Sequence, residues 1–443
     1  MIDRSELEAI AARLVDDAKA AASGAEVSVR VGTGRAANVR FGANEVESCG
    51  DVSDEQVSVE VALGKRHARA SGNQIDAKAT RELVARAVAM ARVAPEDPEH
   101  MPVLPPQSYV AVPDSFDRGM ADMSSEARAM TAQVALAAAR QAGLNSAGFL
   151  ETSAGEVVVA NSAGLRASHR DTFGSFSMTA RTRDATGSGW AIRASHEARA
   201  IDAAAVVRAA ADKALRSANA RPLDPGKYTV VLEPAAVADL LEFFSWPLSA
   251  RAVDEGRSAL TKPGGGSRLG EAIASPIVTL RSDPADGDIP AAPFDDEGAP
   301  RQAVSWIDRG VLSALHYGRY WAAKQGKAPT PFGNMHLSGG EARSIDDLAS
   351  GVKRGLLVTH FFYIRVLDPH EASVTGLTRD GLFLIEDGKV TTPVNNFRFN
   401  HSLLALLKNC DAMTRETWRV TSGLRVPAIR TTEFNMASVS EAV

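Results

Sequence analysis

The sequence predicts an α+β fold, with an N-terminal α/β domain over residues 1–220 and a strand-rich C-terminal domain over residues 227–443. Three observations lead to this prediction. Apolar residues near the N-terminus first recur with a helical period and then alternate, as in a helix followed by strands. Two prolines and a glycine in Arg221–Lys227 indicate a domain boundary. After residue 244 the chain is mainly strand and turn, which predicts a curved antiparallel sheet or a barrel-like arrangement.

The first helix is predicted by its cap and its apolar face. Asp3 suits the N-cap position, Glu6 follows three residues later, and Gly24 ends the pattern. The alternation that follows predicts short strands at 27–31, 38–41, 56–63 and 66–70. We expect Gly32–Gly34 to form a turn between the first two of these strands.

The rest of the N-terminal half alternates between helices and strands. Further helices are predicted at 77–93, 124–141 and 203–217, and a proline-rich connector without periodicity occupies residues 94–120. Glycines near the expected turns divide the segment between the last two helices into four short strands, at 146–152, 156–160, 165–170 and 172–181.

The C-terminal half begins with a strand at 228–232 and a helix at 234–244, whose first turn contains Pro234. A short helix is predicted at 344–351. The clearest strands beyond these are 277–280, 301–306, 356–362 and 382–386. Asp387-Gly388 lies between two extended segments and predicts a hairpin turn.

The composition excludes several classes of function. The chain has 443 residues, of which 45% are hydrophobic and 23% charged, as in ordinary globular proteins. A net charge of −5 and an isoelectric point near 6.0 favour neither nucleic acid nor an anionic membrane as partner. The two cysteines suit a reducing compartment, and the N-terminus resembles no signal peptide. With no apolar run long enough for a membrane span, we expect a cytoplasmic protein.

A contiguous zinc-peptidase motif is missing from the sequence. Such a motif places a second His four or five residues after a His-Glu pair, so that one helical face presents both imidazoles. The chain has two His-Glu pairs, His196-Glu197 and His370-Glu371, and no His follows either at that spacing. A discontinuous metal site stays open as an alternative, built from residues of the C-terminal half that could converge: His336, His360, His370, Glu371 and Cys410.

Other catalytic motifs are missing too. The sequence contains no Gly-x-Ser-x-Gly elbow and no phosphate-binding glycine loop. Cys410 ends an apolar helical stretch, which favours a buried structural thiol over a nucleophile. The acidic run Asp295-Asp296-Glu297 has two interpretations, a turn between strands or a site for a cation or a peptide amine, and the residue types alone favour the turn.

Four segments carry a resemblance to a known family. They are Phe294–Pro300 (FDDEGAP), Asn334–Gly340 (NMHLSGG), Gly355–His360 (GLLVTH) and Gly381–Pro393 (GLFLIEDGKVTTP). In this order and spacing they resemble the TldD/TldE (PmbA) metallopeptidase family. The similarity extends over nearly the whole chain and is more specific in the C-terminal half.

The resemblance implies a member without its own metal. In TldD-like members the catalytic helix follows the first strand of the C-terminal domain, and the matching segment here, Pro234–Trp246, has no His. Those members also take a cysteine ligand shortly before a Val-Pro, and Val420–Pro427 has no Cys. The chain therefore resembles TldE-like members, for which we expect no catalytic residue, no metal ligand and no cofactor in this subunit.

The function that follows from the resemblance is a subunit of a peptidase complex. A TldD-like zinc peptidase subunit would hydrolyse unfolded or extended peptides, and this chain would help to enclose the chamber. The candidates for contact with the chamber or peptide are Asp295, Asp296, Glu297, His336 and His360. Two alternatives stay open: a homodimeric peptide-binding or scaffold protein without a protease partner, and an active hydrolase with a non-standard site. An aromatic-rich stretch, Leu356–Asp368, departs from the family pattern.

Overall fold

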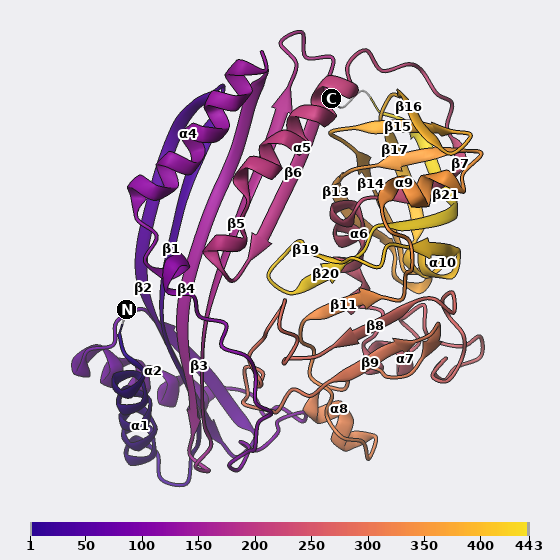
Figure 1. Cartoon of the computed structure of the whole chain (residues 1–443). Coiled ribbons are helices and arrows are strands. Elements are labelled where there is room, and N and C mark those ends of the chain that lie inside the picture. The colour runs from indigo at the N-terminus through magenta and orange to yellow at the C-terminus, as the bar shows by residue number, and fades with distance from the viewer. Residues whose placement is uncertain (1, 441–443) are drawn as a thin grey trace.

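The computed structural model describes residues 2–440, which form two halves built on three β-sheets (Figure 1). The N-terminal half contains one six-stranded sheet with the order β3-β2-β1-β4-β5-β6. Every neighbouring pair in it is antiparallel. The strands are β1 (Glu26–Gly42), β2 (Glu45–Leu63), β3 (Arg66–Gly72), β4 (Asn145–Asn161), β5 (Arg166–Arg181) and β6 (Ser188–Ser195).

The long strands correct the prediction of many short ones. The predicted turn at Gly32–Gly34 is wrong, because β1 continues through it, and β4 and β5 each join two predicted strands. Gly32 instead allows β1 and β4 to pack closely. A Cβ atom on Gly32 would lie 3.2 Å from the carbonyl oxygen of Glu156, tighter than an ordinary contact.

Helices cover one face of this sheet at its two ends. Near one end, α1 (Arg4–Ala21) and α2 (Ala77–Val93) pack on the valines of β1 that begin with Val27. Near the other, α4 (Ser125–Gln141) and α5 (Ala203–Arg216) pack around Phe41. A short helix, α3 (Arg118–Ala121), lies between α2 and α4 in the sequence. The predicted helices are confirmed closely, and Asp3 caps α1 by accepting the Glu6 N–H at 2.9 Å.

The C-terminal half contains a six-stranded sheet, in the order β10-β9-β8-β11-β20-β19, and a nine-stranded sheet, in the order β13-β14-β17-β21-β7-β12-β15-β16 with β18 paired to β21. The first consists of β8 (Thr279–Ser282), β9 (Val304–Asp308), β10 (Val311–Leu312), β11 (Met335–Ser338), β19 (Trp418–Arg419) and β20 (Leu424–Val426). The second consists of β7 (Gly226–Leu232), β12 (Arg354–Val358), β13 (Phe361–Asp368), β14 (Ser373–Thr378), β15 (Leu382–Glu386), β16 (Lys389–Pro393), β17 (Phe397–Ser402), β18 (Cys410–Met413) and β21 (Ile429–Val439).

These two sheets are mixed rather than purely antiparallel. β11 runs parallel to β20, and β12 runs parallel to β7. Over residues 2–440 neither sheet closes on itself, so the barrel-like arrangement expected from the sequence is wrong. The nine-stranded sheet has two open edges, one at β13 and one at β16.

Short helices connect the strands of the C-terminal half. They are α6 (Pro234–Leu241), α7 (Ala250–Asp254), α8 (Arg319–Lys324), α9 (Ile345–Ser350) and α10 (Leu403–Lys408), with 3₁₀ turns at Ala198–Ala200, Glu242–Ser245 and Pro369–Glu371. The predicted helix at 234–244 thus ends in a 3₁₀ turn. The predicted hairpin turn is confirmed: Asp387 and Gly388 both have positive φ, 44° and 82°.

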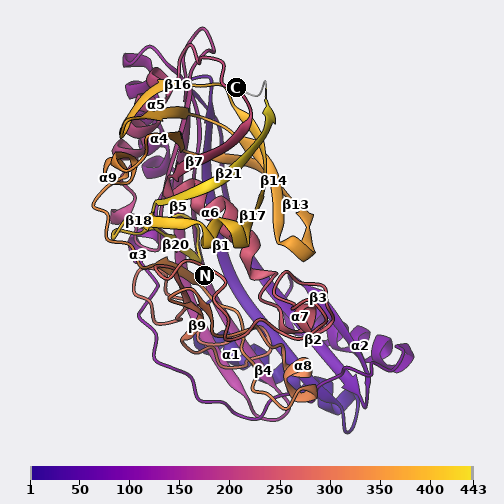
Figure 2. The same ribbon diagram turned by 90° about the vertical axis from the view of Figure 1, so that its right-hand side faces the viewer.

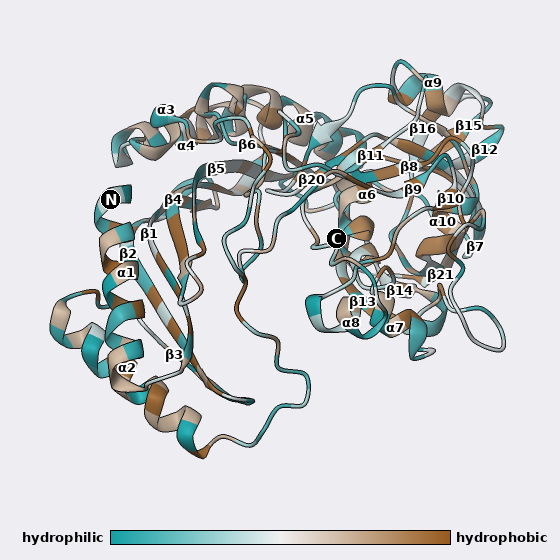
Figure 3. Ribbon diagram, turned by 90° about the horizontal axis from the view of Figure 1, so that it is seen from below, coloured by the Kyte–Doolittle hydropathy of each residue, from teal (hydrophilic) through white to brown (hydrophobic). Residues whose placement is uncertain are grey.

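The C-terminal half lies against the sheet face that the helices leave uncovered (Figure 3). From the C-terminal side, its strands cross in front of the long N-terminal strands (Figure 2). Polar contacts join the two halves. The Tyr109 hydroxyl donates to the Gly298 carbonyl at 2.9 Å, and Lys213 pairs with Glu233 at 2.5 Å. None of the helices within residues 2–440 is long and apolar enough to cross a membrane.

Candidate functional site

Cavities lie along the N-terminal sheet, and two of them are lined by residues of both halves. The uncovered face of β1 is poor in large apolar side chains, because the residues that point there include Arg30, Gly32, Gly34 and Ala36. A cavity of about 510 Å³ lies along this stretch. Two more cavities lie at opposite ends of β1, and we name them after a histidine in each: the His67 cavity, which Glu26 also lines, and the His360 cavity, which Ala43 also lines.

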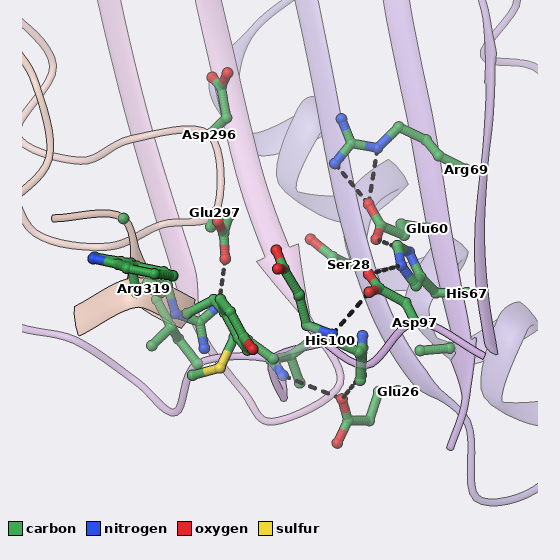
Figure 4. Close-up of a pocket in the computed structure, with 18 of the residues that line it drawn as sticks. Glu26, Ser28, Glu60, His67, Arg69, Asp97, His100, Asp296, Glu297 and Arg319 are labelled. Carbon is green, nitrogen blue, oxygen red and sulfur yellow. Dashed lines mark hydrogen bonds and ion pairs between the residues drawn. The ribbon is translucent and has the colours of Figure 1, made fainter. Parts of the chain in front are cut away.

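The His67 cavity has a volume of about 460 Å³ and is rich in charged side chains from both halves (Figure 4). His67 on β3 contacts two carboxylates, Glu60 through Nδ1 and Asp97 through Nε2, each at 3.0 Å. The His100 ring lies 5.3 Å from that of His67 and pairs with Glu26 at 3.4 Å. The hydrogen bond to Asp97, reinforced by the charge of Glu60, raises the pKa of His67 above its ordinary value.

The acidic run reaches this cavity, and its three members have different contacts. The Asp295 carboxylate accepts the backbone N–H groups of Glu297 and Ala299, at 3.0 and 2.9 Å, and so holds a turn. Asp296 pairs across the boundary with Arg30 at 3.1 Å. Glu297 pairs with Arg319 of α8. Asp296 and Glu297 line the cavity, whereas the Asp295 carboxylate stabilises the turn of its own loop.

The His360 cavity, of about 600 Å³, combines residues that are distant in sequence. The His360 ring stacks on the indole of Trp190 of β6, with a centroid distance of 4.1 Å and an interplanar angle of 14°. His360 Nδ1 lies 3.3 Å from the Asp380 carboxylate, which also accepts the Ser188 hydroxyl at 2.5 Å. These contacts join β6 of the N-terminal half to the nine-stranded sheet.

Helix α6 places a second carboxylate beside His360. Asp239 Oδ2 accepts the backbone N–H of Phe361 at 2.9 Å and lies 3.9 Å from His360 Nε2. Burial raises the pKa of Asp239 to about 6, despite the opposing effects of His360 and the Phe361 N–H. Burial acts in the same direction on Asp380, but hydrogen bonds from His360 and Ser188 outweigh it and lower the Asp380 pKa.

His336 belongs to a separate cluster in the six-stranded C-terminal sheet. It is 8% exposed, and its Nδ1 lies 3.2 Å from the carboxylate of Asp286. The Arg425 guanidinium lies 3.5 Å from the same carboxylate. Although burial raises the pKa of Asp286, His336, the Asp288 N–H and Arg425 together lower it to about 2. His336 lines neither the His67 cavity nor the His360 cavity, so the structure does not bring the five candidates into one site.

The side chains of residues 2–440 offer no donor set that fits a zinc ion. Zinc in peptidases takes three protein ligands, mostly imidazole nitrogens. Among residues 2–440, no group of three His, Cys, Asp or Glu side chains has a geometry that could hold a metal. Helix α6 contains no His, and its Asp239 carboxylate accepts the Phe361 N–H. Cys410 is buried, and burial raises its pKa to about 12, far from the thiolate form.

Comparisons with known proteins decide the family. The model of the PmbA/TldA metallopeptidase central domain matches residues 118–218, and that of the C-terminal domain matches residues 225–438. The chain belongs to the PmbA/TldD metallopeptidase family. A metalloprotease of Methanothermobacter thermautotrophicus is 25% identical over 46% of this chain and 47% of its own length. A metalloprotease of Archaeoglobus fulgidus is 28% identical over 43% of this chain and 41% of its own length.

A solved structure extends the similarity in fold to nearly the whole PmbA/TldD chain. TldE from Thermococcus kodakarensis superposes with a TM-score of 0.85 at 20% identity, and the match covers 97% of this chain and all of that one. The matches to the two archaeal metalloproteases span under half of their length. The comparisons therefore establish the family and the fold.

The sequence did not reveal some residues in and beside the His360 cavity. Trp190 and Arg379 line the His360 cavity from positions far apart in the chain, and no local pattern marks them. Asp239 did carry a signal, because it is a single carboxylate between the apolar residues Ala238 and Leu240 of a short helix. A lone acid in such a stretch either is partnered or has a raised pKa. Asp239 turns out to be both.

Proposed function

We propose that this chain is a non-catalytic subunit of a zinc peptidase and that a TldD-like partner supplies the metal. The observation that carries the proposal is the absence of a histidine pair from α6. This helix follows directly after β7, and its polar side chain is Asp239, which accepts the Phe361 N–H. The chain would then contribute walls and contacts to a shared chamber instead of a nucleophilic water.

The boundary between the halves supports a role in enclosing peptide. The uncovered face of β1 is polar and glycine-rich, and cavities lie along it. An unfolded peptide needs a surface that tolerates many side chains, which such a face provides.

The edge strand β13 supports peptide contact in a second way. Phe362, Tyr363, Val366 and Leu367 on it are 43%, 63%, 51% and 55% exposed. An exposed, apolar strand edge can accept an extended peptide through main-chain hydrogen bonds.

An affinity pull-down tests the proposal. The tagged chain is expressed in its native cells and recovered, and mass spectrometry identifies what accompanies it in near-equal amount, with the tag alone as control. We expect a protein that carries His-Glu-x-x-x-His, and peptidase activity in the recovered complex. Recovery of the chain with itself alone would contradict the proposal and favour a homodimeric peptide-binding protein.

A further inference from the structure

Among the described residues, more arginine than carboxylate side chains line the His360 cavity. The guanidinium groups of Arg181 and Arg379 line it. Of the described lining residues, Asp380 is the one carboxylate, and its side chain is 4% exposed. The Ser188 hydroxyl and His360 Nδ1 contact that carboxylate, and Arg379 Nε lies 3.8 Å from it. A ligand that enters the cavity therefore meets the Arg379 guanidinium, whose side chain is 26% exposed, and little accessible negative charge.

The same cavity has an apolar, aromatic wall. Trp190 lines it and carries the stacked His360 ring on one face. Phe362 lines it too, is 43% exposed, and lies 4.3 Å under the Arg379 guanidinium. Stacking on Phe362 holds the guanidinium plane in place, so less freedom is lost when an anion binds. A volume of about 600 Å³ is in the range of small-ligand sites.

We propose that the His360 cavity binds the C-terminal carboxylate of a peptide, with Arg379 as its anion contact and the Trp190–Phe362 wall against its last side chain. Arginine pairs with carboxylates through two parallel hydrogen bonds, a geometry that a neutral amide cannot satisfy equally. A peptide N-terminus is disfavoured, because its ammonium would face like charge. Phe362 also belongs to the exposed edge of β13, so a peptide along that edge has a direct path to the cavity.

The peptide nature of the ligand rests on the proposed function, whereas its anionic end follows from the cavity. Calorimetric titration of the full chain tests the inference with two probes: acetyl-tetraalanyl-phenylalanine with a free carboxylate, and the same peptide as its C-terminal amide. We expect the acid to bind about tenfold more tightly than the amide, the effect of one charge-assisted hydrogen-bond pair. Equal binding of acid and amide would overturn the inference.

Variants of two arginines test which side chain distinguishes the acid from the amide. Arg379→Gln should weaken binding of the acid about tenfold and leave the amide unchanged, and Arg379→Lys should restore part of the loss. Arg365→Gln is the matched control, because Arg365 lies on β13, stacks 4.3 Å from the Tyr363 ring, and does not line the cavity. An equal loss in Arg365→Gln would place the anion contact elsewhere and overturn the inference.

The outcome is separable from that of the pull-down. Selectivity for the acid in a chain that recovers no zinc-peptidase partner would refute the proposed function alone. A recovered partner together with equal binding of acid and amide would refute this inference alone.

Discussion

The His67 and His360 cavities contain the same kinds of group, histidine beside carboxylates and arginine, but they differ in exposure. The side chains of His67, Glu60 and Asp97 are 32%, 25% and 39% exposed. Those of His360 and Asp380 are 14% and 4% exposed. Water and salt screen the first set, so each ion pair there contributes little. In the second set, a lost partner leaves a buried polar group unpaired.

The difference suggests distinct tasks for the two ends of the boundary. In the His67 cavity, carboxylates such as Glu26, Glu60 and Glu297 are paired with basic side chains, and these pairs link segments of the chain. In the His360 cavity, Asp380 is the one carboxylate among the described lining residues, its side chain is 4% exposed, and the Arg379 side chain beside it is 26% exposed. Substitutions at the two ends should therefore differ in size and in pH dependence.

The largest effect is expected for Asp380→Ala. It removes the acceptor of the Ser188 hydroxyl and of His360 in a buried setting, and should lower the free energy of unfolding by about 3 kcal/mol. Urea unfolding measures this loss. Asp296→Ala in the other cavity, at a side chain 84% exposed, is the control and should change stability by less than about 0.5 kcal/mol. Equal losses would remove the distinction between the cavities.

An intermediate effect of opposite sign is expected for Asp239→Asn. The pKa of Asp239 is raised from 3.8 to about 6, so the unfolded chain ionises first and wild-type stability falls as pH rises through this interval. The amide has no such loss and can still accept the Phe361 N–H. The variant should therefore be more stable than wild type above pH 6, by about 2 kcal/mol, and the difference should shrink toward pH 4.

Thermal unfolding from pH 4 to pH 8 measures that difference. Asp212→Asn, at an exposed carboxylate on α5, is the control and should show no comparable pH trend. A variant less stable than wild type at pH 8 would show that the Asp239 carboxylate is a stabilising partner of His360.

The smallest effect is expected for His67→Gln. The pKa of His67 is raised above 6.5, so its ion pairs stabilise fully below that pH and are lost as pH rises through the folded-state pKa. The substitution should cost less than about 1 kcal/mol at pH 5.5, and the cost should shrink at pH 8.5. Denaturant unfolding at the two pH values measures it. A cost that grows with pH would show that neutral His67 is the stabilising form.

Local patterns predicted the elements whose determinants are local. The cap at Asp3 and the turn at Asp387-Gly388 were placed correctly because each depends on a few adjacent residues. Glycines misled the prediction of the sheet, since Gly32 lies inside β1, where the neighbouring strand, not the local sequence, requires it. The mixed sheets could not be predicted, because β11 and β20 pair across a long sequence separation.

The site was predictable only in part for the same reason. The acidic run was noticed, and its turn interpretation suits Asp295, whose carboxylate holds the loop. His336 and His360 were grouped because both lie in the C-terminal half, yet they belong to different clusters. The Trp190–His360 stack joins residues of opposite halves, and no spacing in the sequence encodes such a contact.

The central claim, that this chain contributes no zinc ligand to a zinc peptidase, is tested most directly by metal analysis. Zinc is determined by mass spectrometry in the purified chain, in its His360→Ala variant, and in the complex with the partner. The account predicts no stoichiometric zinc in the chain alone, and zinc in the complex that is unaffected by His360→Ala. Stoichiometric zinc in the chain alone, lost together with peptidase activity in His360→Ala, would contradict the account.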